Sequence, residues 1–231
     1  SLFAREIKRP DLLYEKVIEL NVRYDAKGNE LAPLDAEEAK KKLKRLFDTG
    51  IRSIAVVFMH SYKFPDHEKQ VGRLAEQIGF EQISLSHEVS PLIKFISRGD
   101  TTITDAYLSP VLNKYLQEIM SAFDDNLDKL NLLFMTSSGG LTSAKLFRGK
   151  EAILSGPASG IVGAVKTSAS SGFNKIITFD MGGTSTDVAH YAGIVEKEFE
   201  TEIAGIRIRV PMTKINTVAA GGGSILSYKD G

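Results

Sequence analysis

A short glycine turn between two apolar segments constrains this chain more than any other feature of its sequence. Residues 179–188 read Phe-Asp-Met-Gly-Gly-Thr-Ser-Thr-Asp-Val, so one predicted strand ends at an aspartate and a second strand follows the turn. Glycines let backbone N–H groups come close to an anion, and hydroxyl groups add further donors. Because an aspartate at a strand end can hold hydrated Mg²⁺, the segment predicts a phosphate and metal site at Asp180.

Two common nucleotide motifs do not explain this turn. The chain contains no G-x-x-x-x-G-K-[ST] sequence, and a strand follows the turn where a dinucleotide-binding fingerprint requires a helix. The alternative interpretation is a glycine-rich hairpin turn without a ligand.

Two further segments are rich in small residues. Gly221, Gly222 and Gly223 lose much conformational entropy on folding, so they indicate either a flexible loop or a backbone that must contact another group. A predicted helix over 158–169 contains Gly160, Gly163 and Ala164, and we expect it to pack closely against another backbone, with a hinge role as a functional extension.

Helical and strand patterns alternate over residues 35–86, which predicts an α/β fold with a mostly parallel sheet. Asp35 and Glu38 form a capping box at the first helix, and Gly79 ends the second. A turn at 25–29 is predicted to join two strands, the first over 17–22.

A long helix is predicted from Asp100 to about Phe123, with Pro110 kinking or dividing it. The polar residues around its expected start, which include Arg98, Thr101 and Asp105, are interpreted as capping and helix-dipole groups. Two alternating segments, Val195 to Ile203 and Ile206 to Val210, are expected to form antiparallel hairpins.

Composition excludes several classes of function. Lys plus Arg and Asp plus Glu each total 29, so the chain lacks the basic surplus of a nucleic-acid-binding protein. It has no cysteine, which excludes disulfides and thiolate metal sites, and we expect a cytoplasmic location. Its apolar runs are too short to cross a membrane, and its four histidines show no metal-ligand spacing.

Several segments spread along the chain resemble one known family. They are Phe58 to Tyr62 (FMHSY), Ser84 to Pro91 (SLSHEVSP), Asp105 to Pro110 (DAYLSP), Phe134 to Leu141 (FMTSSGGL), Leu154 to Ala164 (LSGPASGIVGA), Ile177 to Val188 (ITFDMGGTSTDV) and Ile215 to Ile225 (INTVAAGGGSI). Together, and in this order, they resemble the hydantoinase A/5-oxoprolinase family of the actin-like ATPase superfamily, whose ATP-dependent members open cyclic amides. Residues 95–99 are more similar to the 5-oxoprolinase branch.

The resemblance implies an actin-like ATPase (ribonuclease H-like) two-lobe fold that is present only in part. Residues 1–140 would be the C-terminal part of the first lobe, residues 141–174 a crossover segment with the small-residue helix, and residues 175–231 the start of the second lobe. The family's first phosphate loop would lie before Ser1 and its adenosine-contacting segment after Gly231, so we expect the fragment alone to be inactive.

The resemblance also implies a reaction and its site. ATP would phosphorylate the amide oxygen of 5-oxoproline or a hydantoin, and water would then open the ring. Asp180 would be the catalytic residue that orients Mg²⁺, and Asp187 would be a second metal residue unless it only stabilises the turn. The residues expected to contact ATP are Gly182, Gly183, Thr184, Ser185, Gly221, Gly222 and Gly223.

The implied partners are a small-molecule lactam, a second (hydantoinase B-like) subunit or domain, and further copies in a homo-oligomer. Two alternatives stay open. One is a subunit of an ATP-dependent acetone/acetophenone-type carboxylase, and the other is a nucleotide-gated interaction module without its own chemistry.

Overall fold

The computed structural model describes residues 12–123, 131–203 and 205–227, and these form two compact units. The first unit contains the described residues up to 123, together with 148–150 and 200–210. The second contains 131–147, 151–199 and the described residues from 211 onward. Neither unit is contiguous in sequence. The lobe boundaries expected at residues 140 and 174 stay predictions, because compactness does not test them.

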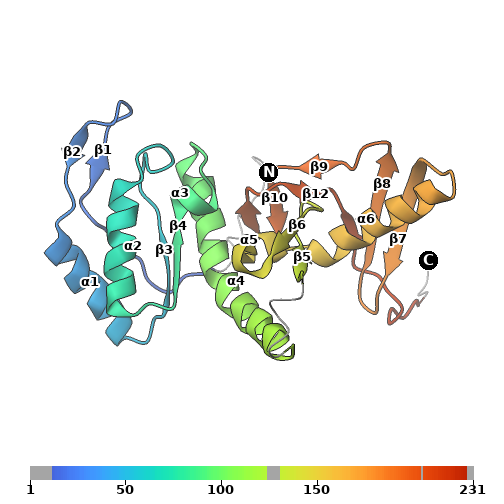
Figure 1. The fold of residues 1–231 in the computed structure, drawn as a ribbon, viewed down its shortest axis with the longest axis horizontal. Helices are drawn as coiled ribbons and strands as arrows, with labels where there is room; N and C mark the ends of the chain where they lie inside the picture. The colour runs from blue at the N-terminus through green and yellow to red at the C-terminus, as the bar shows by residue number, and fades with distance from the viewer. Residues whose placement is uncertain (1–11, 124–130, 204, 228–231) are drawn as a thin grey trace. The chain divides into compact units, whose positions relative to one another are not determined.

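A two-stranded parallel sheet forms the middle layer of the first unit (Figure 1). Its strands are β3 (Ser53–Val56) and β4 (Gln82–Leu85). Helix α2 (Asp66–Ile78), backed by α1 (Ala36–Asp48), lies on one side, and α4 (Phe95–Ser121) lies on the other. The α/β pattern predicted for residues 35–86 is therefore confirmed. The buried side chains of the core are Leu43, Val56, Val71, Ala75 and Phe80.

Local signals fix several element ends as predicted. The Asp35 carboxylate accepts the Glu38 N–H at 2.9 Å at the start of α1, and Gly79 ends α2 with a left-handed φ of 106°. The predicted turn joins β1 (Arg23–Tyr24) to β2 (Glu30–Ala32). The strand expected over 17–22 is wrong, because these residues have no partner strand in the described part of the chain.

Helix α4 is longer than the sequence predicts and is not divided at Pro110. Proline has no N–H, so the carbonyl of Ala106, one turn earlier, loses its usual helical partner. The Ser53 hydroxyl of β3 donates to this carbonyl at 2.5 Å instead. The side chain from the sheet thus satisfies the acceptor that the proline leaves free.

The capping role expected for the polar residues near residue 100 is wrong. Helix α4 begins at Phe95, so Arg98, Thr101 and Asp105 lie inside it and are buried. The Thr101 hydroxyl accepts the Arg209 N–H at 3.0 Å and so fastens the segment after strand β11 (Ile206–Ile208) to α4. These side chains make tertiary contacts rather than local caps.

A three-stranded antiparallel sheet and one helix dominate the second unit (Figure 1). Strands β7 (Lys175–Met181) and β8 (Thr186–Ala192) form a hairpin, and β13 (Asn216–Val218) pairs with β8. Helix α6 (Ser155–Ser170) packs against β7 and β8. The remaining elements of the chain are α3 (Ser86–Val89), β5 (Leu133–Met135), β6 (Leu141–Ser143), η2 (Ala144–Leu146), α5 (Gly149–Ala152), β9 (Lys197–Glu198), β10 (Thr201–Ile203), β11 (Ile206–Ile208) and β12 (Met212–Thr213).

The antiparallel hairpin pairing expected for the segments 195–203 and 206–210 is confirmed in part. Strands β10 and β11 pair directly, whereas β9 pairs with β12, so the segment 195–203 does not form one strand. A break between β9 and β10 separates these two pairings.

The small-residue helix forms as predicted, but its glycines do not pack against another backbone. A Cβ built at Gly160 or Gly163 would meet nothing within 4 Å in the described part of the chain. The close-packing interpretation is therefore wrong for these positions, and Gly160 lines a cavity instead.

Within the described ranges, no helix combines the length and the apolar character that a membrane crossing requires.

The cap at Asp35 gives a first prediction. Asp35→Ala removes the acceptor for the Glu38 N–H and should lower the free energy of unfolding by about 1 kcal/mol. Lys41→Ala, on the exposed surface of the same helix, should change it by less than about 0.5 kcal/mol. Urea denaturation followed by circular dichroism measures both. Equal effects of the two substitutions would show that the cap contributes nothing.

Candidate functional site

The two glycine segments that the sequence singles out lie against each other. The Gly222 N–H donates to the Gly182 carbonyl at 2.9 Å, and the Gly223 N–H donates to the Gly183 carbonyl at 2.8 Å. The loop that follows β13 is therefore joined to the β7–β8 turn by backbone hydrogen bonds. The 182–183 turn and the 221–223 loop, which are far apart in the sequence, thus form one structure, called the paired loops below.

Gly221 has no room for a side chain. A Cβ there would lie 2.7 Å from the Gly182 carbonyl oxygen and equally close to backbone atoms of Gly183 and Thr184. Real Cβ atoms do not approach backbone this closely, so a larger residue would displace the turn. The glycine is needed for close approach rather than for flexibility.

Three hydroxyl groups reinforce the paired loops. The Thr186 hydroxyl, which is buried, donates to the Ala220 carbonyl at 2.6 Å. Ser224 accepts the Gly221 N–H at 3.0 Å, and Thr217 donates to the Asp187 carboxylate at 2.6 Å. The sequence analysis gave these residues no role, although each belongs to a segment that it quoted.

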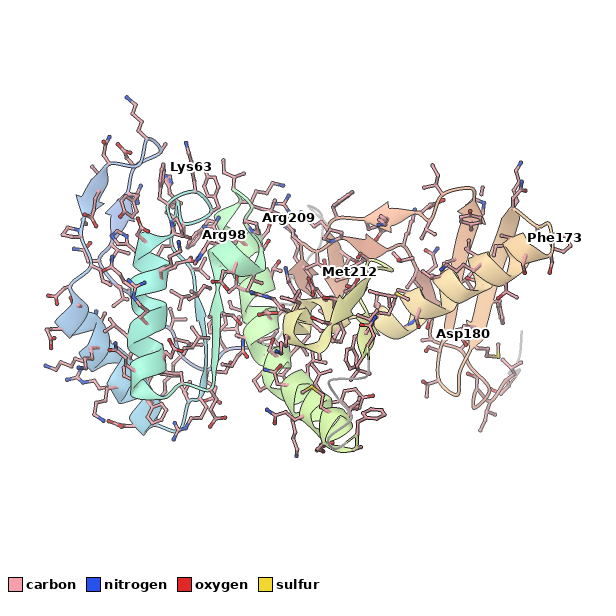
Figure 2. The ribbon with its side chains drawn as sticks, viewed as in Figure 1. Lys63, Arg98, Phe173, Asp180, Arg209 and Met212 are labelled. Atoms are coloured by element: carbon pink, nitrogen blue, oxygen red, sulfur yellow. The ribbon has the colours of Figure 1, made fainter. Side chains whose placement is uncertain are left out.

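Asp180 and Asp187 are directly opposite each other across the hairpin. Opposed residues of an antiparallel pair share one face, so two negative charges lie side by side. The Asp187 carboxylate accepts from Thr217, whereas no described residue hydrogen-bonds to the Asp180 carboxylate, which is exposed on β7 (Figure 2). Like charges at this spacing are unfavourable unless a cation lies between them.

A cavity of about 250 Å³ lies between this carboxylate face and helix α6. Asp180 and Asp187 line one wall, and Pro157, Gly160 and Ala164 of α6 line the opposite wall. The turn itself is exposed at Gly182, Gly183 and Thr184. The site is therefore open rather than sealed by side chains.

Few of the glycine N–H groups are free to bind an anion. Gly182 donates to the Ser185 carbonyl, and the N–H groups of the 221–223 run bond to the turn or to Ser224. In the described part of the chain, the N–H groups of Gly183 and Thr184 have no recorded acceptor. The Ser185 N–H likewise has no acceptor among the described residues, so these three consecutive groups are the available donors, and the other glycines hold them in place.

The donor set suits a hydrated divalent cation more than a fully protein-bound one. No group of three or more acidic or histidine side chains that could hold a metal occurs among the described residues. Two carboxylates on one face match Mg²⁺, which keeps several waters and binds through one or two carboxylates plus phosphate.

Two family models match the chain. One, described as Hydantoinase/oxoprolinase, matches residues 98–231. The other, described as Hydantoinase/oxoprolinase N-terminal region, matches residues 1–79.

Curated relatives match the whole chain. A 5-oxoprolinase of Dictyostelium discoideum is 42% identical over 269 residues, which cover 100% of this chain and 21% of the relative. The caprolactamase subunit alpha of Pseudomonas jessenii is 30% identical, covering 99% of this chain and 32% of that relative. The chain thus spans about a fifth to a third of these relatives.

Two solved structures resemble the fold. The ATP-dependent caprolactamase from Pseudomonas jessenii has a TM-score of 0.79 at 28% identity, covering 99% of this chain and 35% of that one. The second is a nucleotide-free structure of acetone carboxylase, an enzyme of ATP-dependent acetone carboxylation. It has a TM-score of 0.77 at 27% identity, and the match covers 87% of this chain and 29% of the carboxylase chain. The predicted α/β fold, present in part, is confirmed by these likenesses.

The steric constraint at Gly221 gives a second prediction. Gly221→Ala in the full-length protein should displace the β7–β8 turn, cost about 1–3 kcal/mol of stability and weaken ATP binding at least about tenfold. Gly222→Ala is the matched control, because its Cβ would meet its nearest described atom at an ordinary 3.7 Å. Thermal unfolding and titration with a fluorescent ATP analogue measure both effects. A Gly221→Ala protein that binds ATP as well as the control would refute the constraint.

Proposed function

The chain belongs to the hydantoinase/oxoprolinase family, and from this premise we propose that it carries part of the nucleotide site of an enzyme that uses ATP to hydrolyse a cyclic amide. The observation that carries the proposal is the paired glycine structure beside the Asp180–Asp187 carboxylate pair. It combines N–H groups that have no acceptor among the described residues, two opposed carboxylates and a cavity, and these are the kinds of group that phosphoryl transfer uses together.

An unactivated lactam is a poor electrophile, which is the chemical reason for using ATP. Phosphorylation of the amide oxygen provides a good leaving group, and water can then attack the ring carbon. Mg²⁺, when bound, would neutralise charge on the transferred phosphoryl group.

The proposed roles follow from the contacts of each residue. Asp180 and Asp187 would hold hydrated Mg²⁺, with Asp180 the residue that has no other partner in the described part of the chain. Gly183 and Thr184 would donate their N–H groups to phosphate oxygens. Ser185 stays a proposed contact, and Gly182, Gly221, Gly222 and Gly223 would support the donors by shaping the turn.

The 42% identity to a 5-oxoprolinase supports 5-oxoproline as the substrate, with a hydantoin or another lactam as the nearest alternative. A carboxylase subunit is the second candidate, supported by the TM-score of 0.77 with acetone carboxylase. The caprolactamase relative is a subunit alpha, which supports a second subunit as a partner of this chain. A homo-oligomer and a cytoplasmic location complete the proposal.

The carboxylate at Asp180 gives a third prediction, for the full-length protein with any partner subunit it requires. Asp180→Ala should lower lactam-dependent ATP hydrolysis by about 100-fold or more, because removal of one electrostatic contributor to a transition state has an effect of this size. Asp48→Ala, on exposed helix α1, is the control and should leave turnover unchanged. Release of ADP and formation of glutamate from 5-oxoproline are the measurements.

The same assays separate the alternatives. Bicarbonate-dependent consumption of a ketone without glutamate formation would support the carboxylase. An Asp180→Ala protein with full lactam turnover would exclude an enzymatic role for this site.

A further inference from the structure

Helix α6 of the second unit contains three glycines that its own folding does not require. Glycine is among the least favourable residues in a helix interior. Gly156, Gly160 and Gly163 have no left-handed φ, so the backbone conformation does not demand glycine at these positions. A Cβ built at each of them would meet nothing within 4 Å in the described part of the chain. Packing within the described residues therefore does not demand glycine either.

Gly160 differs from Gly163 in what it faces. Four residues of α6 line the cavity beside the carboxylate pair, and they follow the spacing i, i+3, i+4, i+7 of one helix face: Pro157, Gly160, Ile161 and Ala164. Gly163 is not among the residues that line this cavity. A side chain at position 160 would therefore extend into the cavity rather than against protein atoms.

The wall opposite Gly160 carries two negative charges. Asp180 and Asp187 line it, and among the described residues the Asp187 carboxylate accepts from Thr217 at 2.6 Å whereas the Asp180 carboxylate has no hydrogen-bond partner. Two carboxylates fill only part of the coordination of a divalent cation, so water and phosphate must supply the rest. Mg²⁺ gives up its waters reluctantly. A Mg²⁺ ion held by this wall thus needs space for its water shell.

The cavity has the size for that shell and offers little to replace it. A water molecule takes about 30 Å³ in the liquid, so an octahedral shell of about six waters needs about 180 Å³. The cavity volume is about 250 Å³. The Thr178 hydroxyl, which also lines the cavity, already accepts the Ala189 N–H at 3.1 Å. Most of the other lining residues are apolar, including Ile161, Val188 and Ile215. Space, rather than further protein ligands, is what this wall provides.

We propose that Gly160 makes the site selective for Mg²⁺, because its missing side chain leaves room for the water shell of the cation. The inference rests on the proposed function. Asp180 and Asp187 would hold the hydrated cation from one wall, and its waters would extend toward the α6 backbone at Gly160. A methyl group at this position would displace a water without reproducing its hydrogen bonds. Gly160 is thus a specificity-determining residue that forms no bond through a side chain.

The decisive comparison is Gly160→Ala against Gly163→Ala in the full-length protein with any partner subunit it requires. Neither new Cβ meets a described atom within 4 Å, and alanine favours a helix, so both variants should unfold at or above the wild-type temperature. The Mg²⁺ concentration for half-maximal binding of a fluorescent, non-hydrolysable ATP analogue should rise at least about tenfold in Gly160→Ala and stay within about twofold in Gly163→Ala, since changes around a bound metal have effects of this size.

Two other cations test the role of the water shell itself. Ca²⁺ has flexible coordination and can replace a lost water with a second carboxylate oxygen, so Gly160→Ala should change the Ca²⁺ requirement by less than about threefold. Cobalt(III) hexaammine keeps its six ligands, which do not exchange, and it mimics a fully hydrated cation. It should compete with Mg²⁺ in the wild type and fail to compete in Gly160→Ala.

The outcomes separate this inference from the proposed function. A wild-type protein that does not bind the ATP analogue in the presence of Mg²⁺ overturns both. If the wild type binds it, a Gly160→Ala protein with a near-normal Mg²⁺ requirement overturns the selectivity role alone. Equal losses with Mg²⁺ and Ca²⁺, or a lowered unfolding temperature for Gly160→Ala, would also overturn it, because they would show that the methyl group distorts the site in general. Binding that is weakened equally without any cation would show that the cavity holds the nucleotide instead.

Discussion

Backbone-to-backbone contact between two glycine segments determines the geometry of the candidate nucleotide site. The loop after β13 bonds through Gly222 and Gly223 to the β7–β8 turn, and Gly221 allows this approach because it has no side chain. Gly222 and Gly223 use their N–H groups in this contact, and Gly182 and Gly221 bond within their own segments, so among the described residues of the turn the N–H groups of Gly183, Thr184 and Ser185 have no acceptor. These glycines lose conformational entropy on folding, and the result is a turn of fixed geometry. N–H donors that are fixed in this way would need little reorganisation when negative charge develops beside them.

The carboxylates beside this turn show the same preorganisation. Strand register places Asp180 opposite Asp187, and within the described residues neither carboxylate forms an ion pair with a lysine or arginine. Thr217 holds the Asp187 carboxylate in place, whereas the Asp180 carboxylate has no hydrogen-bond partner among the described residues. In the first unit the charge problem is solved differently, because Arg98 and Glu68 are buried together and connected through Ser86.

The helix ends and strands that depend on neighbouring residues could be predicted from the sequence. Asp35 and Gly79 act on their immediate neighbours, and the apolar segments on either side of the Asp180 turn define β7 and β8. The start of α4 could not be predicted, because Arg98 and Thr101 are held by distant loops rather than by a capping pattern. The glycine segments were each identified, but their contact depends on how β13 pairs with β8. No local pattern marks Glu68, because its carboxylate accepts the N–H of His87, which is 19 residues away in the sequence.

The division of the chain into two discontinuous units has a consequence for its assembly and engineering. Residues 148–150 and 200–210 return to the first unit after the chain has already entered the second. Neither unit can therefore be expressed as an uninterrupted stretch of polypeptide, and a ribosome must release more than 200 residues before the first unit has all its parts. Limited proteolysis within 131–199 would separate the β10–β11 hairpin from the earlier part of the first unit, to which it belongs. A circularly permuted gene would need to keep every segment that passes between the two units.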